Sequence, residues 1–168
     1  MSQEILELSQ KEHDWIAGNE EFARRLFKDL GLKSDGLQSI DPRMLDAAWA
    51  AWLGRHIRGR EDPNPFINAF GITFGQYLAE RLDLSWKIVT DEDGTELALH
   101  GQPGDILVFP PSLVGKRYVA GVTQFFAEVF AEMEQSIGLT RRGRLPDGAQ
   151  SADPARGWYR RVSRRRVH

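Results

Sequence analysis

The stretch that decides the fold runs from Trp86 to Arg117 and reads WKIVTDEDGTELALHGQPGDILVFPPSLVGKR. It holds three short apolar runs separated by two turn signals. The first turn, at 91–94, is typical of a tight hairpin, because Gly94 tolerates the positive φ that such a turn requires. The second turn, at 101–105, is rich in Gly, and a Pro-Pro pair ends the last apolar run. The pattern predicts three antiparallel strands within this stretch.

Helical periodicity surrounds the predicted strands. Apolar side chains recur at helical spacing in four segments, residues 9–31, 41–57, 64–82 and 122–137. Asp41 precedes Pro42, a combination that caps and opens a helix, and Asn64 with Pro65 repeats it. We expect a break in the first helix near Gly18.

Further local signals refine these helices. The acidic segment 1–15 is helical in pattern, and Gly138 is expected to end the last helix. Ser112 is placed to cap a short helical segment after the third strand. Gly71 and Gly75 lie four residues apart on one helix, which predicts close packing of that helix against a neighbour.

The order of the elements predicts an α+β fold. It has N-terminal helices, a three-stranded antiparallel sheet at about 86–109 and a C-terminal helix, with the helices packed on one face of the sheet. A chain of 168 residues is long enough for one domain with its own core. We assign residues 1–140 to this domain. Residues 141–168 form an arginine-rich C-terminal arm.

Composition excludes several classes of site. The chain has no Cys, which removes disulfides, thiolate metal sites and cysteine nucleophiles and fits a reducing cytoplasm. No apolar run approaches the roughly 20 residues that span a bilayer. The N-terminus lacks the basic start and apolar core of a signal peptide. We therefore predict a cytoplasmic protein without a membrane span.

Charge is divided unevenly along the chain. The arm 141–168 holds nine of the 22 basic Lys and Arg residues but two of the 24 acidic ones. Arginines neutralise phosphates, and interleaved Trp and Tyr can stack on exposed bases. The same mixture suits an acidic protein, an anionic membrane surface or the acidic body of this chain itself. The candidate binding residues in the arm are Trp158, Tyr159, Arg160, Arg161, Arg164 and Arg165.

A second candidate site consists of four polar residues near one end of the predicted sheet. His100 ends a strand, Asp105 follows the next turn, and Lys116 and Arg117 follow the third strand. A cationic pair there could hold an anion, with His100 as an acid or base. The alternative is that the two cations pair with acidic helices and His100 is merely exposed.

Recognised catalytic and metal motifs are missing. Gly115-Lys116 is no phosphate loop, because Arg117 stands where Ser or Thr is needed. Ser112 lacks the flanking glycines of a nucleophile elbow. The four His residues show no metal-ligand spacing, and the acidic run at 91–93 is better explained as a solvated turn than as a cation site. No cofactor or metal site is predicted.

The pieces WKIVTDEDGTELALHG and ILVFPPSLVGKR resemble a bacterial domain of unknown function, number 3806. The shared features are a strand that begins with Trp, an acidic turn ending in Gly-Thr, a strand ending in Pro and a Val-x-Lys-Arg segment. The preceding helix, with Asn68, Phe74 and Gly75, is similar too. The resemblance covers about residues 45–137. It implies no established activity, substrate or catalytic residue.

These observations favour a non-enzymatic module that binds a protein partner, in an adaptor-like or immunity-like role. The role is an analogy drawn from the fold class. One alternative is an enzyme or small-ligand binder that uses His100, Asp105, Lys116 and Arg117. The other is nucleic-acid binding through the arm.

Overall fold

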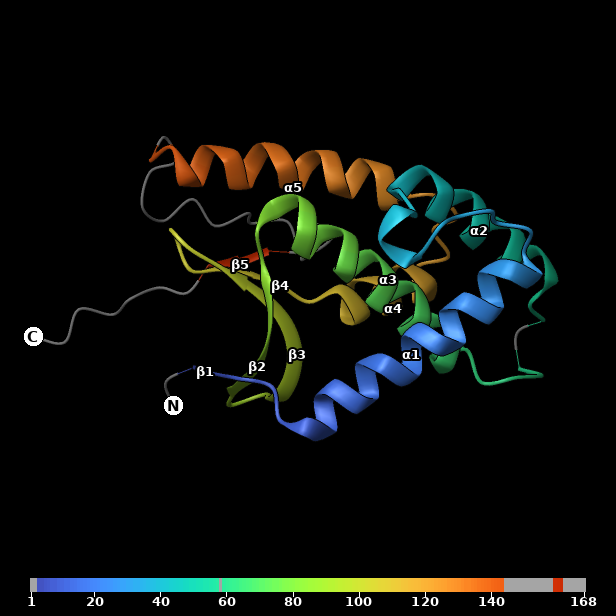
Figure 1. The fold of residues 1–168 in the computed structure, drawn as a ribbon, viewed down its shortest axis with the longest axis horizontal. Helices are drawn as coiled ribbons and strands as arrows, with labels where there is room; N and C mark the ends of the chain where they lie inside the picture. The colour runs from blue at the N-terminus through green and yellow to red at the C-terminus, as the bar shows by residue number, and fades with distance from the viewer. Residues whose placement is uncertain (1–2, 58, 144–158, 162–168) are drawn as a thin grey trace, which may run out of the picture.

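A computed structural model of the protein describes residues 3–57, 59–143 and 159–161 (Figure 1). An antiparallel sheet forms one layer, and the helices gather on one side of it. This arrangement confirms the predicted α+β class with helices on one face.

Five α-helices are present in the described part of the chain, with a short 3₁₀ turn, η1 (Leu37–Ser39), between the first two. They are α1 (Gln10–Asp29), α2 (Pro42–Arg55), α3 (Asn64–Leu82), α4 (Pro110–Val119) and α5 (Phe126–Arg141). The central helix is α3, which contacts α1, α2, α4, α5 and η1. Buried residues occur all round α3, as expected for a helix enclosed by its neighbours.

The sheet is wider than the three predicted strands. Its order is β1 (Glu4–Leu6), β2 (Ser85–Asp91), β3 (Gly94–Gly101), β4 (Ile106–Val108) and β5 (Tyr159–Arg161), all antiparallel. The hairpin is confirmed, since Asp91 pairs with Gly94 across a two-residue loop. The prediction missed β1 and β5 because three residues are too few to show the alternation that identifies a strand.

Several helix limits were predicted wrongly. The N-terminal segment is not helical throughout, because residues 4–6 form β1, and α1 runs unbroken through Gly18. The side chain of Asn19 donates to the Trp15 carbonyl, 2.9 Å away, and so follows the helix instead of interrupting it. Likewise, α5 continues past Gly138 to Arg141, where the guanidinium donates to the Asp83 carbonyl at 3.0 Å.

Helix starts follow the predicted residues only in part. Asp41 caps α2 as predicted, accepting from the backbone N–H groups of Arg43 and Met44 at 2.9 Å. At α3 the predicted cap is wrong, because Asn64 is already the first residue of the helix and Pro63 precedes it without a capping side chain. The Asn64 N–H donates instead to the Asp62 carboxylate. Ser112 does not cap α4, because the helix already begins at Pro110 and the Ser112 hydroxyl donates to Glu96.

The start of α5 depends on a residue far away in the sequence. The carboxylate of Asp46, in α2, accepts from the backbone N–H groups of Phe125, Phe126 and Ala127 at 2.7, 2.8 and 3.0 Å. Asp46 is 6% exposed. A buried charge is tolerated when hydrogen bonds satisfy it, and the N-terminus of a helix favours a negative charge. Asp46 therefore ties the start of α5 to α2.

Close packing at Gly71 and Gly75 is confirmed. A Cβ atom at Gly71 would lie 2.7 Å from the Pro111 Cα, and one at Gly75 would lie 2.3 Å from the Trp86 ring. These glycines let α3 approach both the start of α4 and the sheet.

The two faces of the sheet differ in what they contact. Trp86, Leu99, Ile106 and Val108 belong to the main core with the helices. On the other face, Val89, Ala98 and Leu107 form a small cluster with Ile5 and Phe109. Among the helices that the structure describes, none is both long enough and apolar enough to cross a bilayer.

Candidate functional site

The predicted polar cluster is split between two ends of α5. His100 and Asp105 lie together, with His100 Nε2 3.6 Å from Asp105 Oδ1. Their turn rests on the end of α5, since a Cβ atom at Gly104 would lie 2.4 Å from the Thr140 methyl carbon. This half of the cluster lies near the C-terminus of α5.

Lys116 and Arg117 lie in the last turn of α4, and the Arg117 guanidinium is 5.9 Å from the ring centre of Phe125. Phe125 immediately precedes α5. A helix of 16 residues is about 24 Å long. The structure therefore does not bring the four predicted side chains into one pocket.

Within the arm, the structure describes residues 141–143, at the end of α5, and residues 159–161. Tyr159, Arg160 and Arg161 form β5, opposite Val108, Leu107 and Ile106 of β4. Trp158, Arg164 and Arg165 lie outside the described residues. Part of the predicted arm thus extends the sheet of the domain.

We expect a form of the protein that ends at Gly143 to unfold at a lower temperature than the full chain and to self-associate. Without β5, the apolar strand β4 becomes an edge with unpaired backbone groups, which favours pairing with other chains. Thermal unfolding and size-exclusion chromatography measure both effects. An unchanged midpoint with an unchanged elution position would show that β5 does not stabilise the sheet.

A buried histidine network was missed by the sequence analysis. His56 Nδ1 is 3.0 Å from Glu61 Oε1, and His56 Nε2 is 2.8 Å from the Tyr118 hydroxyl. The His56 ring stacks on Trp52, and its side chain is 1% exposed. Because both ring nitrogens are engaged, His56 holds the connection between α2 and α3 against α4. Its partner Tyr118 is 62 residues away, so no local pattern could reveal the pair.

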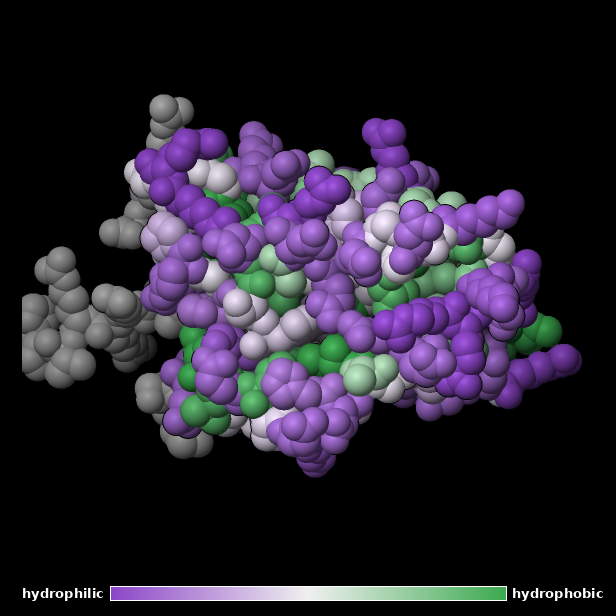
Figure 2. Space-filling view, in the orientation of Figure 1, coloured by the Kyte–Doolittle hydropathy of each residue, from purple (hydrophilic) through white to green (hydrophobic). Residues whose placement is uncertain are grey.

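A groove opens where α1 begins, beside β3 and the first turn of α4. Its volume is about 400 Å³. We call it the Trp15 groove, after a side chain that is 41% exposed there. It is lined by Lys11, Glu12, Trp15, Thr95, Glu96, Leu97, Pro111 and Ser112. Figure 2 shows hydrophobic atoms at the surface between the strands and α1, bordered by hydrophilic ones.

The acidic groups of the Trp15 groove already have partners. The Glu12 carboxylate accepts from the Ser9 N–H at 2.7 Å and from the Ser9 hydroxyl, and these bonds lower the pKa of Glu12, the hydroxyl most. Glu96 accepts from the Ser112 hydroxyl. Both carboxylates are thereby fixed at the rim. The apolar surfaces of Trp15, Leu97 and Pro111 remain for an incoming group.

The backbone of β3 is open beside this groove. β4 is only three residues long and pairs with Leu99, His100 and Gly101 of β3, so Thr95–Leu97 has no strand on that side. Asp91 and Gly94 flank the two-residue loop of the hairpin and form a hydrogen-bonded pair. Hydrogen-bonded and non-hydrogen-bonded pairs alternate along an antiparallel ladder, so Thr95 and Leu97 belong to non-hydrogen-bonded pairs. Their N–H and C=O groups therefore point away from β2. Within the described residues these groups make no backbone hydrogen bond on that side.

Comparison with known proteins finds a family match for the middle of the chain. Residues 49–130 match the model of a family described as Domain of unknown function (DUF3806), which confirms the resemblance seen in the sequence. No curated protein and no solved structure matches the chain. The matched residues include the β3 and α4 sides of the Trp15 groove and leave out its α1 side.

Proposed function

We propose that this chain, whose residues 49–130 form a DUF3806 domain, is a non-enzymatic protein-interaction module that binds its partner in the Trp15 groove. The observation that carries the proposal is the exposed Trp15 ring beside an apolar groove with a polar rim. Protein interfaces have this anatomy, and Trp is enriched among the residues that dominate binding energy. An adaptor-like or immunity-like role needs only such a surface.

The groove also defines what the partner presents. A volume of about 400 Å³ suits one or two apolar side chains. The open N–H and C=O groups of Thr95 and Leu97 suit the main chain of an extended segment. Glu12 and Glu96 at the rim favour a basic residue next to the apolar one. The proposed ligand is thus a short extended segment with an apolar residue flanked by Lys or Arg.

The enzyme alternative is not supported by the geometry, because it required His100, Asp105, Lys116 and Arg117 in one pocket. Nucleic-acid binding through the arm stays a prediction. The test compares how nucleic-acid binding depends on salt concentration for the full chain and for the form that ends at Gly143.

We expect Trp15→Ser to weaken binding of the partner by about 30-fold, the loss typical of a central Trp in an interface. The partner is first recovered by affinity capture from native extract with tagged full-length protein, and its affinity is then measured by calorimetry. Because Trp15 is exposed, the substitution leaves the core intact, which a thermal unfolding curve checks.

Val119→Ser is the matched control. Val119 is also apolar and is 80% exposed, but it lies at the far end of α4 from the groove. A partner retained by Val119→Ser and lost by Trp15→Ser supports the proposal. Failure to recover a stoichiometric partner, or equal binding by both variants, would overturn it.

A further inference from the structure

A second cavity lies toward the other end of α1. It has a volume of about 770 Å³ and is formed by the C-terminal half of α1, residues 32–40 and the start of α2. Ligand sites in proteins span about 300–1,000 Å³, so the cavity has the size of a small-molecule site. We call it the lysine cleft, because Lys28 and Lys33 stand at its rim. It shares no residue with the Trp15 groove.

Positive charge prevails at the rim of the lysine cleft. Arg24 is held by carboxylates of its own helix, 3.9 Å from Glu20 and 3.4 Å from Glu21. Lys28 and Lys33 are exposed and form no ion pair with any described residue.

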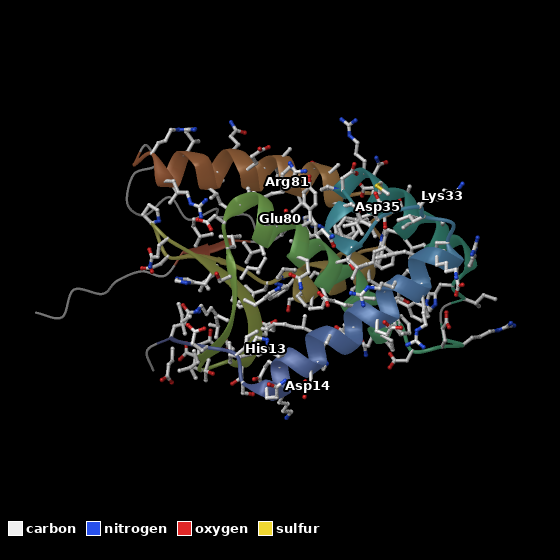
Figure 3. The ribbon with its side chains drawn as sticks, in the orientation of Figure 1. His13, Asp14, Lys33, Asp35, Glu80 and Arg81 are labelled. Carbon is white, nitrogen blue, oxygen red and sulfur yellow. The ribbon has the colours of Figure 1, made fainter. Side chains whose placement is uncertain are left out.

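The acidic side chain in the lining is Asp35. Figure 3 labels Lys33 and Asp35 on the segment that joins α1 to α2. Two cations and one carboxylate in the lining leave an excess of positive charge that attracts an anion.

The inner wall of the cleft is apolar. Phe27 and Ile40 are 2% and 1% exposed and belong to the main core, while Leu32 and Met44 are half-buried at the cleft. A hydrated inorganic anion would use only the lysines and leave this apolar wall in water. An aliphatic chain covers the exposed parts of Leu32 and Met44 and gains the free energy of burying them.

We propose that the lysine cleft binds an amphiphilic carboxylate of medium chain length. Its carboxylate lies between Lys28 and Lys33, and its aliphatic chain lies against Leu32 and Met44. The charge of the rim and the apolar wall together select this class of ligand, since each half of the molecule meets its complement. The inference does not depend on the proposed function at the Trp15 groove.

The probe is decanoate, titrated into the full-length protein by calorimetry below the concentration at which decanoate forms micelles. We expect saturable binding of one decanoate per chain. The double variant Lys28→Gln, Lys33→Gln is expected to bind at least about tenfold more weakly, because charge-assisted contacts to the carboxylate are lost. Lys116→Gln, an exposed lysine on α4, is the matched control and is expected to bind like the unaltered chain.

Two further probes separate the halves of the ligand. Acetate keeps the carboxylate without the chain, and decanol keeps the chain without the charge. Each is expected to bind at least about tenfold more weakly than decanoate. Absence of saturable decanoate binding, equal binding of decanol, or unchanged binding after loss of both lysines would overturn the proposal. All three lysines are exposed, so folded protein is expected for every variant.

Discussion

Replacing Asp46 with Ala is expected to lower the free energy of unfolding by about 3–4 kcal/mol, a loss at the upper end for single substitutions. The Asp46 carboxylate accepts three backbone N–H groups at the start of α5, and it is buried. Without it, Phe125 and Phe126 keep buried donors that no water can easily reach. Urea unfolding followed by tryptophan fluorescence measures the change.

Asp41→Ala is the matched control for this experiment. Asp41 also caps a helix, but the N–H groups that it accepts from are only two and three residues away, in the first turn of α2. Its side chain is also less buried than that of Asp46. Loss of such a local cap costs about 1 kcal/mol. If Asp46→Ala costs no more than Asp41→Ala, the three hydrogen bonds that join α2 to α5 contribute no more stability than a local cap.

Gly71→Ala is expected to lower the free energy of unfolding by about 2–3 kcal/mol. The added methyl group would meet the Pro111 Cα at 2.7 Å and the Pro111 nitrogen at 3.0 Å. These are backbone atoms, so α3 and α4 must separate, and no rotation of a flexible side chain can relieve the contact. Thermal and urea unfolding measure the loss.

Gly18→Ala is the same substitution, but it is expected to raise the free energy of unfolding. Gly18 lies inside α1, and a Cβ atom there would have nothing within 4 Å. Ala is preferred to Gly in a helix interior by about 0.5–1 kcal/mol, so this variant is expected to be more stable by that amount. Equal losses at Gly18 and Gly71 would mean that the close approach of α3 to α4 is not what Gly71 provides.

Local signals in the sequence predicted some of the features that depend on neighbouring residues, although the caps at Asn64 and Ser112 were predicted wrongly. The hairpin at Gly94 and the cap at Asp41 were predicted correctly, because a turn or a cap needs specific residues within three or four positions. Gly71 and Gly75 were identified by their spacing on one helix. The α+β class followed from the order of the predicted helices and strands.

Long-range contacts left no such signal. Asp46 is 79 residues from Phe125, and His56 is 62 residues from Tyr118, so neither pair shows a periodicity or spacing. The Trp15 groove combines α1, β3 and α4 and could not be predicted from any one of them. The predicted polar cluster failed for the same reason, because nearness in sequence did not show which end of α5 each residue would reach.

The hydrogen bonds of Asp46 also show where this protein cannot be divided. The family match begins at residue 49 and stops at residue 130, inside α5. A gene segment excised at those limits would encode the three N–H donors but not the carboxylate that accepts them, and it would lack α1 and β1. We therefore expect the segment that matches the family to be smaller than the unit that folds by itself. Domain shuffling or recombinant expression is expected to need the chain from β1 through β5, residues 4–161, as one piece.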